Sequence, residues 1–516
     1  MTTELLKNHV AGEWVEGAGA GTTLVDPVTG EELVRVSSEG LDLEKGFAFA
    51  RREGGHALRA MTYGQRAALV GEIGKLLASK KDDYYAIATA NSGTTKPDSG
   101  IDIEGSAYTL GYYAKQGAAL GDAKVLLDGE PASFAKDGSF ASQHVMVPTH
   151  GVALFINAYN FPAWGLWEKA APALLSGVPV IVKPATPTAW LTQRMVKDVI
   201  EAGLLPKGAL SVVCGSPKGL LDQVQAFDVV SFTGSASTAA MFRGHDAFAK
   251  RSARLNCEAD SVNSAVLAPN AGAALEAFVK EVVREMTQKS GQKCTAIRRA
   301  FVPRAQFDQV AEAIKAQLAK TTVGNPRNES VRMGAIVNQQ QLATVKEGIA
   351  QLRKETELLF GGDTSFVDAD PKVAALIGPH LLGDASGKSR LVHEIEVFGP
   401  VATLLPYDAD PAAEAAKGGG SLVASVFGDD EGELASIALD LAPTHGRVHT
   451  VTSAVAKGHT GHGNVMPQSL HGGPGRAGGG EELGGLRALN FYHRRSAVQG
   501  TPGALAKLAP SAKIGG

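Results

Sequence analysis

Cys294 has the sequence setting of a reactive thiol. It lies in the short polar segment Ser290-Gly-Gln-Lys-Cys-Thr295, directly after an apolar helical stretch from Ala274 to Met286. A cysteine that only fills a core is more often surrounded by Val, Ile and Leu, where burial raises its pKa and keeps it inert. A thiolate can attack an electrophilic carbon and later leave again, as a covalent intermediate requires. Cys294 is therefore a candidate nucleophile, although for such a segment taken alone a structural cysteine is the more frequent case.

Two other polar residues follow short apolar runs that are typical of buried strands. Asn160 lies in the loop Asn157–Pro162 after such a run, and Glu258 closes the alternating segment Arg254-Leu-Asn-Cys-Glu258. An amide can hold an oxyanion, a carboxylate can take a proton from water, and a thiol can carry an acyl group. Asn160, Glu258 and Cys294 together therefore predict carbonyl chemistry, provided that the fold brings them to one place.

The elements that would position these residues indicate an α/β fold. From Gly151 onward, short runs of Val, Ile and Leu alternate with helical stretches such as Trp164–Ser176 and Ala189–Ala202. This alternation favours a parallel sheet covered by helices on both faces. A second alternation runs from about Asp260 to Val465. We therefore predict two Rossmann-like, doubly wound domains.

Length, composition and charge exclude several classes of protein. The 516 residues suffice for about three domains. With 44% hydrophobic and 20% charged residues, a largely disordered chain is excluded. The net charge of −3 gives no general attraction to nucleic acid or membrane, and there is no secretory signal or apolar run of transmembrane length. We expect a cytoplasmic protein without these partners. Cys214, Cys257 and Cys294 form no metal-ligand cluster, so we expect no metal.

Six short motifs, in the same order along the chain, connect it with a known family. They are YNFP at 159–162, VKPAT at 182–186, FTGS at 232–235, GQKC at 291–294, VGNP at 323–326 and EVFGPV at 396–401. Over nearly its whole length the chain resembles the aldehyde dehydrogenase superfamily. The tail MPQSLHGGPGRAGGGEELGGL, residues 466–486, resembles the branch that oxidises coenzyme A (CoA)-linked semialdehydes in the aerobic breakdown of benzoate and phenylacetate.

The resemblance implies a role for individual residues. Cys294 would be the nucleophile, the Asn160 amide and the Cys294 backbone N–H would hold the oxyanion, and Glu258 would activate water. A GxGxxG fingerprint is missing from the strands between Gly151 and Thr233, and the strand-to-helix turn that begins at Phe232 takes its place. The implied cofactor-binding residues are Lys183, Thr186, Phe232, Gly234, Ser235, Glu396 and Phe398.

Two departures from the family pattern bear on the cofactor. Many NAD-preferring relatives carry glutamate where this chain has Thr186, and a carboxylate there would repel a 2′-phosphate. Threonine removes that repulsion and offers a hydroxyl, with Lys183 nearby to pair with phosphate charge, so NADP is favoured over NAD. The second departure is Ala259-Asp260-Ser261, which stands where the family has glycines, so the backbone near the nicotinamide can differ.

The predicted layout assigns each part of the chain a task. Residues 1–129 and 151–259 form the cofactor-binding domain and residues 260–466 the catalytic domain. Residues 130–150 and 487–516 form a small β oligomerisation element, and residues 467–486 form a glycine-rich loop near the substrate entrance. Asp137-Gly138 is a hairpin turn signal inside the oligomerisation element. Because such elements cross between subunits in the family, we expect a homodimer first and a dimer of dimers second.

The predicted function is the NADP-dependent oxidation of an aldehyde, on a CoA-linked semialdehyde, to the acid through a thiohemiacetal and a thioester at Cys294. Three alternatives remain open. One is a CoA-acylating dehydrogenase, and another is a non-catalytic nucleotide-binding protein. The third, a cysteine hydrolase, needs a histidine base near Cys294, and none of the 13 histidines lies in the matched catalytic motifs. The candidate cations for CoA phosphates, which could equally be ordinary surface charges, are Arg298, Arg299, Arg476, Arg494 and Arg495.

Overall fold

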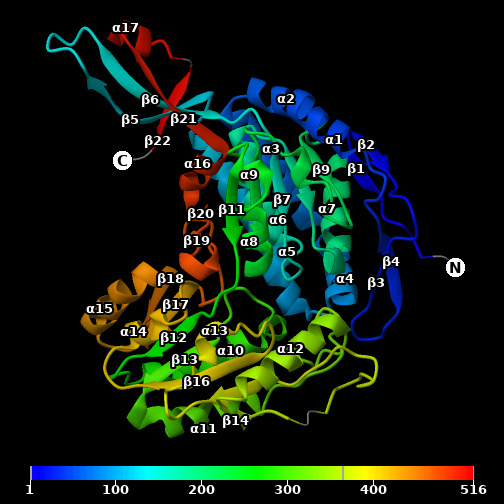
Figure 1. The fold of residues 1–516 in the computed structure, drawn as a ribbon, viewed down its shortest axis with the longest axis vertical. Coiled ribbons are helices and arrows are strands. Elements are labelled where there is room, and N and C mark those ends of the chain that lie inside the picture. The colour runs from blue at the N-terminus through cyan, green and yellow to red at the C-terminus, as the bar shows by residue number, and fades with distance from the viewer. Residues whose placement is uncertain (1–2, 363–364, 509, 515–516) are drawn as a thin grey trace.

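The structure is a computed structural model that describes residues 3–362, 365–508 and 510–514. Two large sheets flanked by helices form the upper and lower parts of the molecule, and a smaller sheet projects from the upper part (Figure 1). This arrangement confirms the predicted α/β fold with two doubly wound units and a small β element.

The upper sheet has the strand order β11-β10-β7-β8-β9-β1-β2. Its strands are β7 (Ala153–Ile156), β8 (Val180–Lys183), β9 (Leu210–Val212), β10 (Val229–Thr233), β11 (Arg254–Glu258), β1 (Asn8–Val10) and β2 (Glu13–Val15). β7 to β11 are parallel, whereas β1 and β2 extend the edge in antiparallel pairing. Because the carboxyl ends of parallel strands meet at one edge, the residues that follow β7, β8, β10 and β11 come close together.

Helices cover both faces of the upper sheet. They are α1 (Leu43–Phe49), α2 (Gly55–Ala60), α3 (Tyr63–Ser79), α4 (Lys81–Ser92), α5 (Lys96–Ala119), α6 (Trp164–Ser176), α7 (Ala189–Glu201), α8 (Ala236–Arg243) and α9 (Asp246–Ala249). Alternate residues of β7 enter two different apolar clusters. Phe155 packs with residues of α3, α5, α6 and α7, and Leu154 packs with residues of α1 and α8. A strand buried on both faces explains the continuous apolar runs in the sequence.

Local signals fix the ends of the helices that line the site. α3 begins with a capping box in which Thr62 and Gln65 exchange side-chain and backbone hydrogen bonds. α5 begins after Thr95, whose hydroxyl accepts from the Asp98 N–H, with a proline in the first turn. α6 ends at Gly177, which adopts φ 85° as a left-handed cap.

The lower sheet has the order β14-β15-β16-β13-β12-β17-β18. Its strands are β12 (Ser264–Leu267), β13 (Arg299–Pro303), β14 (Glu357–Phe360), β15 (His380–Gly383), β16 (Val401–Tyr407), β17 (Ser421–Phe427) and β18 (His445–Val451). Around it lie α10 (Ala274–Thr287), α11 (Phe307–Leu318), α12 (Gln339–Leu352), α13 (Leu391–Glu394), α14 (Pro411–Ala416) and α15 (Glu431–Leu441). β14 is antiparallel to β15 and the other pairs are parallel. This sheet and its helices correspond to the second alternation predicted from about Asp260 to Val465.

The projecting sheet has the order β21-β6-β5-β22. It is formed by β5 (Val125–Ser133), β6 (Ala141–Pro148), β21 (His493–Gly500) and β22 (Ser511–Ile514), with α16 (Leu489–Tyr492) and α17 (Pro502–Leu505) nearby in sequence. The predicted hairpin turn is confirmed: Gly138 adopts φ 73° and Asp137 accepts from the Ser139 N–H. β5 begins at Val125, earlier than the predicted start of this element at residue 130.

The glycine-rich stretch 467–486 is a short hairpin against the upper sheet. Within it β19 (Leu470–Gly472) pairs with β20 (Glu481–Leu483). The Ala259 N–H donates to Ala477, and the Gly480 N–H donates to the carbonyl of Cys257, at 2.9 and 3.1 Å. Glycine permits this approach, because a Cβ at Gly478 would lie 2.3 Å from the Cys257 carbonyl oxygen. The stretch predicted as a loop therefore supports the strand that carries Glu258.

β3 (Thr22–Val25) and β4 (Glu32–Val36) form a separate antiparallel ribbon near the N-terminus. Among the described residues, no helix combines the length and the apolar character that crossing a bilayer requires.

Candidate active site

The backbone before Cys294 has an uncommon conformation. Just after α10, Lys289, Ser290 and Gly291 adopt φ of 51°, 55° and 68°. Left-handed backbone costs a non-glycine residue about 1–2 kcal/mol, so two in succession indicate a conformation imposed by the surroundings. At Gly291 a side chain is also excluded, because a Cβ would lie 2.0 Å from the carbonyl oxygen of Gly399.

Buried side chains hold this segment in place. Ser290 Oγ donates to the carbonyl of Gly334 at 2.9 Å. The Gln292 amide donates to the carbonyl of Ala335 at 3.1 Å and accepts from the Val337 N–H at 3.0 Å. These contacts tie the segment to residues 334–337, which lie far from it in the sequence, and they offset the strain.

Two buried cations complete the anchoring. Arg298 donates to the carbonyls of Gly291 and Lys293 at 2.8 and 3.1 Å. Lys293 Nζ lies 2.8 Å from Glu285 Oε1, and both side chains are at most 1% exposed. Removing one partner of such a pair costs about 3–5 kcal/mol. The candidate nucleophile is therefore presented on a firmly supported turn.

The side chain of Cys294 meets those of Glu258 and His471. One atom of each, the sulfur, a carboxylate oxygen and a ring nitrogen, lies within 4.8 Å of the other two. His471 Nε2 is 2.9 Å from Glu258 Oε2, with side-chain exposures of 2% and 5%. Asn160, Glu258 and Cys294 also line one narrow cavity of about 20 Å³. The structure thus brings the three predicted catalytic residues together and adds His471 from β19.

The donors expected to hold an oxyanion are placed beside this cavity. Within the described part of the chain, the Cys294 backbone N–H donates to no backbone carbonyl. The carbonyl of Cys294 is fixed by the Asn263 amide, which donates to it at 2.7 Å and to Ala296 at 3.0 Å. Asn160 is 8% exposed and lines the cavity with Cys294. This arrangement can place two N–H donors at one oxygen.

Opposite charges keep Glu258 ionised in spite of its burial. Burial raises the pKa of a carboxyl group, but the charges of His471 and Lys169 outweigh it and bring the pKa of Glu258 to about 2. Burial lowers the pKa of His471, yet the Glu258 carboxylate raises it overall. Burial, together with the Glu258 carboxylate, raises the pKa of the Cys294 thiol well above its usual value. The pair beside the cavity is therefore a thiol and a carboxylate base.

Glu168 in α6 is a second buried carboxyl group, and its pKa is raised whereas that of Glu258 is lowered. Glu168 and Lys169 are each 2% exposed, and Lys169 Nζ lies 2.5 Å from Glu168 Oε1 and 3.2 Å from Glu482 Oε2. Burial, only partly offset by Lys169, raises the pKa of Glu168 to about 8. Lys169 thus connects a carboxyl lining the narrow cavity with the glycine-rich hairpin. Two adjacent charges in the otherwise apolar helix WGLWEKAAPALLS were the sequence signal for this network, which the sequence analysis missed.

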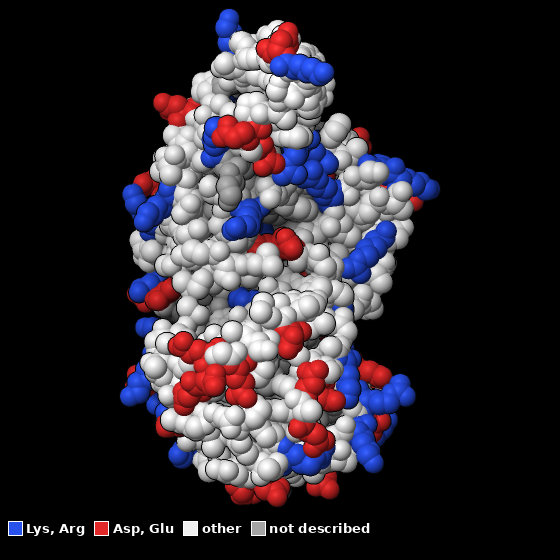
Figure 2. Space-filling model, turned by 90° about the vertical axis from the view of Figure 1, so that its left-hand side faces the viewer, with Lys and Arg blue, Asp and Glu red and all other residues white. Residues whose placement is uncertain are grey.

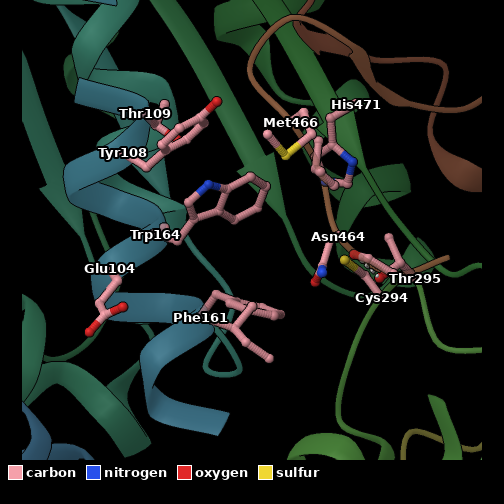
Figure 3. A pocket seen from close by; sticks show the side chains of 14 residues that line it. Glu104, Tyr108, Thr109, Phe161, Trp164, Cys294, Thr295, Asn464, Met466 and His471 are labelled. Carbon is pink, nitrogen blue, oxygen red and sulfur yellow. Dashed lines mark hydrogen bonds between the residues drawn. The ribbon is translucent and has the colours of Figure 1, made fainter. Parts of the chain in front are cut away.

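A larger cavity of about 330 Å³ reaches Cys294 from outside (Figure 3). Tyr108 and Thr109 of α5, together with Phe161 and Trp164, line one wall, and Cys294, Thr295, Asn464, Met466 and His471 line the other. Among the described residues that line it, none is Lys or Arg. The cavity suits an apolar chain that ends at Cys294, and its described lining offers no Lys or Arg for phosphate groups.

Lys183 and Thr186 lie at the end of β8 and in the turn after it. Lys183 is 7% exposed, and burial lowers its pKa. Thr186 Oγ1 donates to the carbonyl of Gly215 at 3.2 Å. The hydroxyl predicted to meet a 2′-phosphate is therefore engaged with the backbone, so the feature that remains in favour of NADP is the missing carboxylate.

The turn between β10 and α8 contains three predicted cofactor residues. Ser235 caps α8 by accepting from the Thr238 N–H at 3.2 Å. Gly234 lies against the ring of Phe232, where a Cβ would approach to 2.5 Å. Phe232 is 4% exposed and packs on Phe242, with ring centroids 4.7 Å apart. Phe232 therefore belongs to the core beneath the turn, and only Gly234 and Ser235 are placed to meet a ligand.

The residues that replace the family's glycines contact both predicted cofactor segments. Asp260 accepts from the Ala236 N–H at the start of α8, at 2.8 Å. The Ser261 N–H donates to Glu396 Oε2 at 3.2 Å. A carboxylate at a helix N-terminus uses an N–H that a phosphate would otherwise use. The altered segment thus adds a carboxylate to the strand-to-helix turn that is predicted to take the place of the GxGxxG fingerprint.

Polar atoms at this edge are consistent with a polar ligand. Thr233 Oγ1 and Glu396 Oε1 are buried without a hydrogen-bond partner among the described residues. Phe398 is covered by the Arg298 guanidinium at 5.5 Å, and Tyr159 meets its ring edge-on at 5.8 Å. The residues that line this edge therefore fit a nucleotide cofactor.

Two expectations about charged residues need correction. Arg298 and Arg299 are 5% and 0% exposed and bond to internal carbonyls, so neither is a surface cation for CoA phosphates. His471 lies beside Cys294 although it is outside the matched catalytic motifs. The absence of a histidine from those motifs therefore gave no argument against a cysteine hydrolase. A lone histidine in a glycine-rich tail carries no local signature that could have revealed its place.

Comparison with known proteins decides the family. The sequence pattern of the aldehyde dehydrogenase family matches residues 14–498. This chain belongs to the aldehyde dehydrogenase family. It is thus an oxidoreductase that acts on an aldehyde group, and the non-catalytic alternative is set aside.

Individual relatives extend this assignment. The 3,4-dehydroadipyl-CoA semialdehyde dehydrogenase of Aromatoleum evansii is 54% identical over 477 residues, 91% of this chain and 93% of the relative. The structure of 3,6-anhydro-L-galactose dehydrogenase in complex with NAP has a TM-score of 0.84 at 21% identity, covering 96% of this chain and all (100%) of that one. The betaine aldehyde dehydrogenase of Staphylococcus aureus in complex with NAD+ has a TM-score of 0.83 at 22% identity, covering 96% and 94%. These two structures show the shared fold.

Proposed function

We propose that this aldehyde dehydrogenase oxidises a CoA-linked semialdehyde, 3,4-dehydroadipyl-CoA semialdehyde or a close analogue, to the acid, with NADP preferred over NAD. The observation that carries the proposal is the meeting of Asn160, Glu258 and Cys294 where an apolar cavity ends. The 54% identity to the Aromatoleum evansii enzyme supports the CoA-linked substrate.

In the first half of the reaction, Cys294 Sγ forms a bond to the aldehyde carbon. Cys294 reacts as the thiolate after its proton has been lost to solvent, and the carbonyl oxygen becomes an oxyanion. The Asn160 amide and the Cys294 backbone N–H would stabilise that charge, because preorganised donors need no reorganisation during the reaction. Removing one such donor typically costs about 100- to 1000-fold in kcat.

Lys183, Gly234, Ser235, Glu396 and Phe398 would hold the nucleotide at the carboxyl edge of the upper sheet. When bound, NADP+ would supply an acceptor for the hydride. The chain's own residues would orient the thiohemiacetal carbon toward that edge.

In the second half, Glu258 takes a proton from water while the water oxygen attacks the thioester carbon. The carbon–sulfur bond then breaks, the sulfur leaves as thiolate, and the acid departs. The low pKa of Glu258, about 2, means that the base form is present throughout the neutral range. This retained base favours water over free CoA as the acyl acceptor.

The CoA part of the substrate would lie outside the cavity. The volume of about 330 Å³ and its apolar and aromatic lining suit the acyl chain. Phosphate groups need cations, and among the described residues no Lys or Arg lines this cavity. The CoA would therefore be a handle bound at the surface and not a reactant.

A homodimer is the proposed assembly. The sheet of β5, β6, β21 and β22 projects from the body (Figure 1), and Phe134 and Phe140 near its turn are 60% and 42% exposed. Figure 2 shows Asp and Glu grouped over the lower part of one face and Lys and Arg beside a hollow in the upper part. A two-fold related copy could cover the apolar tip and bring opposite charges together.

An absorbance assay of nicotinamide reduction tests the proposal. A CoA-linked semialdehyde is compared with its free semialdehyde and with simple aliphatic and aromatic aldehydes, each with NADP and with NAD. We expect the highest kcat/KM for the CoA-linked substrate with NADP, and the free acid as product. Consumption of added free CoA would instead show the acylating reaction. Equal rates for all aldehydes would show that the enzyme does not recognise the CoA part of the substrate.

A further inference from the structure

Cys294, Glu258 and His471 offer the donor types that zinc prefers in proteins: a sulfur, a carboxylate oxygen and an imidazole nitrogen. One such atom from each residue lies within 4.8 Å of the other two, and Glu258 and His471 approach to 2.9 Å. A tetrahedral zinc ion needs its ligand atoms roughly 3.4–3.6 Å apart, given bonds of about 2.0–2.3 Å. Small side-chain rotations would therefore produce the required arrangement.

Two of these donor atoms have no hydrogen-bond partner. Glu258 Oε1 and His471 Nε2 are both buried without one among the described residues. His471 Nε2 approaches Glu258 Oε2 closely but outside hydrogen-bond geometry. Buried polar atoms without a partner cost free energy, and once the Nε2 proton has left, a single cation between the two side chains would satisfy both.

Access also favours a cation at this point. Cys294 and His471 both line the larger cavity, on the same wall (Figure 3), so an ion entering it meets them first. A fourth coordination position would face this cavity and hold water, as in zinc sites with three protein ligands.

We propose that Cys294, Glu258 and His471 form a latent site for Zn²⁺ whose occupation reversibly blocks the enzyme. Binding breaks the S–H bond of Cys294 and the Nε2–H bond of the charged His471, releases both protons to solvent, and forms Zn–S, Zn–O and Zn–N bonds without any redox change. The ion takes no part in aldehyde oxidation. The blocking effect rests on the proposed roles of Cys294 and Glu258, because the bound ion withdraws both the nucleophile and the base, whereas the binding does not depend on those roles.

The test measures metal binding directly, without aldehyde or nucleotide. Metal-free enzyme is titrated with Zn²⁺ in a calorimeter, and with Co²⁺ to record the thiolate-to-metal absorption band. The ligand variants are Cys294→Ser, Glu258→Gln and His471→Phe. The control variants are Cys257→Ser, whose thiol lines a cavity on the other face of β11, and His56→Gln, an exposed histidine.

We expect one Zn²⁺ per chain, and a loss of affinity in each ligand variant larger than the roughly 10- to 100-fold that an outer-shell change costs. The control variants should bind like the wild type, and Mg²⁺ should not compete, because it requires oxygen ligands. Bound Zn²⁺ should protect Cys294 from alkylation and stop turnover until a chelator is added. Unchanged affinity in two of the ligand variants, or a Co²⁺ complex without the thiolate band, would overturn the site. Tight binding without inhibition would keep the site and instead contradict the proposed roles of Cys294 and Glu258.

Discussion

The segment that carries Cys294 and the glycine-rich hairpin that carries His471 are both held in a fixed position, but by different kinds of contact. Residues 289–291 hold left-handed backbone through buried side-chain contacts, including the Lys293–Glu285 pair. The hairpin of β19 and β20 instead contains glycines, and because these lack side chains its backbone lies directly against β11. The first segment can therefore be recognised in the sequence from its polar residues. The second cannot, because its histidine lies in a glycine-rich stretch that resembles low-complexity sequence.

The largest effect is expected at the first segment. Cys294→Ala should abolish aldehyde oxidation, because no other thiol reaches the cavity: Cys214 and Cys257 are both buried elsewhere. Binding of NADP, measured by fluorescence titration, should stay within a few-fold of the wild type. Cys214→Ala is the matched control and should remain active. Substantial steady-state turnover by Cys294→Ala would remove this residue from the mechanism.

Glu258 connects the two segments, and its substitution separates the two halves of the reaction. Glu258→Gln should transfer one hydride per active site in a burst and then stall, because a carboxamide cannot take a proton from water. Intact-mass measurement should show the acyl group retained on Cys294. A variant with neither burst nor adduct would mean that Glu258 is needed earlier, to deprotonate Cys294. Undiminished steady-state turnover would show that another group activates the water.

The hairpin is tested by adding the side chains that it lacks. Gly478→Ala should lower the free energy of unfolding by about 3 kcal/mol, the upper range for a strained position, because its Cβ would meet the Cys257 carbonyl at 2.3 Å with φ at 108°. Gly479→Ala is the matched control: its φ is 71° and nothing lies within 4 Å of the added Cβ, so about 1 kcal/mol is expected. Urea unfolding measures both. If both variants lost the same free energy of unfolding, the backbone conformation of the glycines, and not their contact with β11, would determine the stability of this segment.

These segments also show how far the sequence could lead. The spacing of apolar runs predicted the parallel strands β7 to β10 and the hairpin at Asp137-Gly138, because both depend on local patterns. The placement of Asn160 and Glu258 followed from a general rule, since residues after parallel strands gather at one edge. The strand order of the lower sheet has no such local signal.

The electrostatic partners of the site could not be predicted in this way. His471 is distant in sequence from Glu258, and only the hairpin brings it to 2.9 Å. The adjacent Glu168 and Lys169 in an apolar helix did carry a signal, yet their partner Glu482 belongs to the tail. A pKa depends on charges that converge from several elements, and local sequence patterns do not contain that information.

His471 provides a test of this convergence that depends on pH. The pKa of Glu258 lies at about 2 because His471 and Lys169 outweigh its burial. His471→Phe removes one of these charges, so the pKa should rise, and the base form should then be lost as the pH falls through that higher value. We expect the deacylation rate of this variant to fall at mildly acidic pH, where the wild type is unaffected.

A variant that keeps a positive charge at position 471 distinguishes an effect of charge from an effect of packing. His471→Lys restores a cation near the carboxylate and should move the acidic limb of the profile back toward that of the wild type. Single-turnover measurements of acid release between pH 5 and 8, roughly the range where histidine charge changes matter, would record both profiles. If Phe and Lys variants gave the same profile, the imidazole would act by packing against Trp164 and not by its charge.

The smallest effect is expected away from both segments, at Thr186. A carboxylate at this position would face the 2′-phosphate of NADP, and like charges at a partly screened distance repel by about 1 kcal/mol. Thr186→Glu should therefore raise KM for NADP about fivefold more than KM for NAD. Thr186→Gln separates charge from structure, because both variants lose the hydrogen bond from Thr186 Oγ1 to Gly215 and only one adds a charge. A discrimination shared by both variants would trace the NADP preference to the shape of the turn. If only Thr186→Glu changes the KM for NADP relative to that for NAD, the residue at position 186 affects the choice of cofactor by its charge alone. The hydroxyl of Thr186 itself is hydrogen-bonded to Gly215.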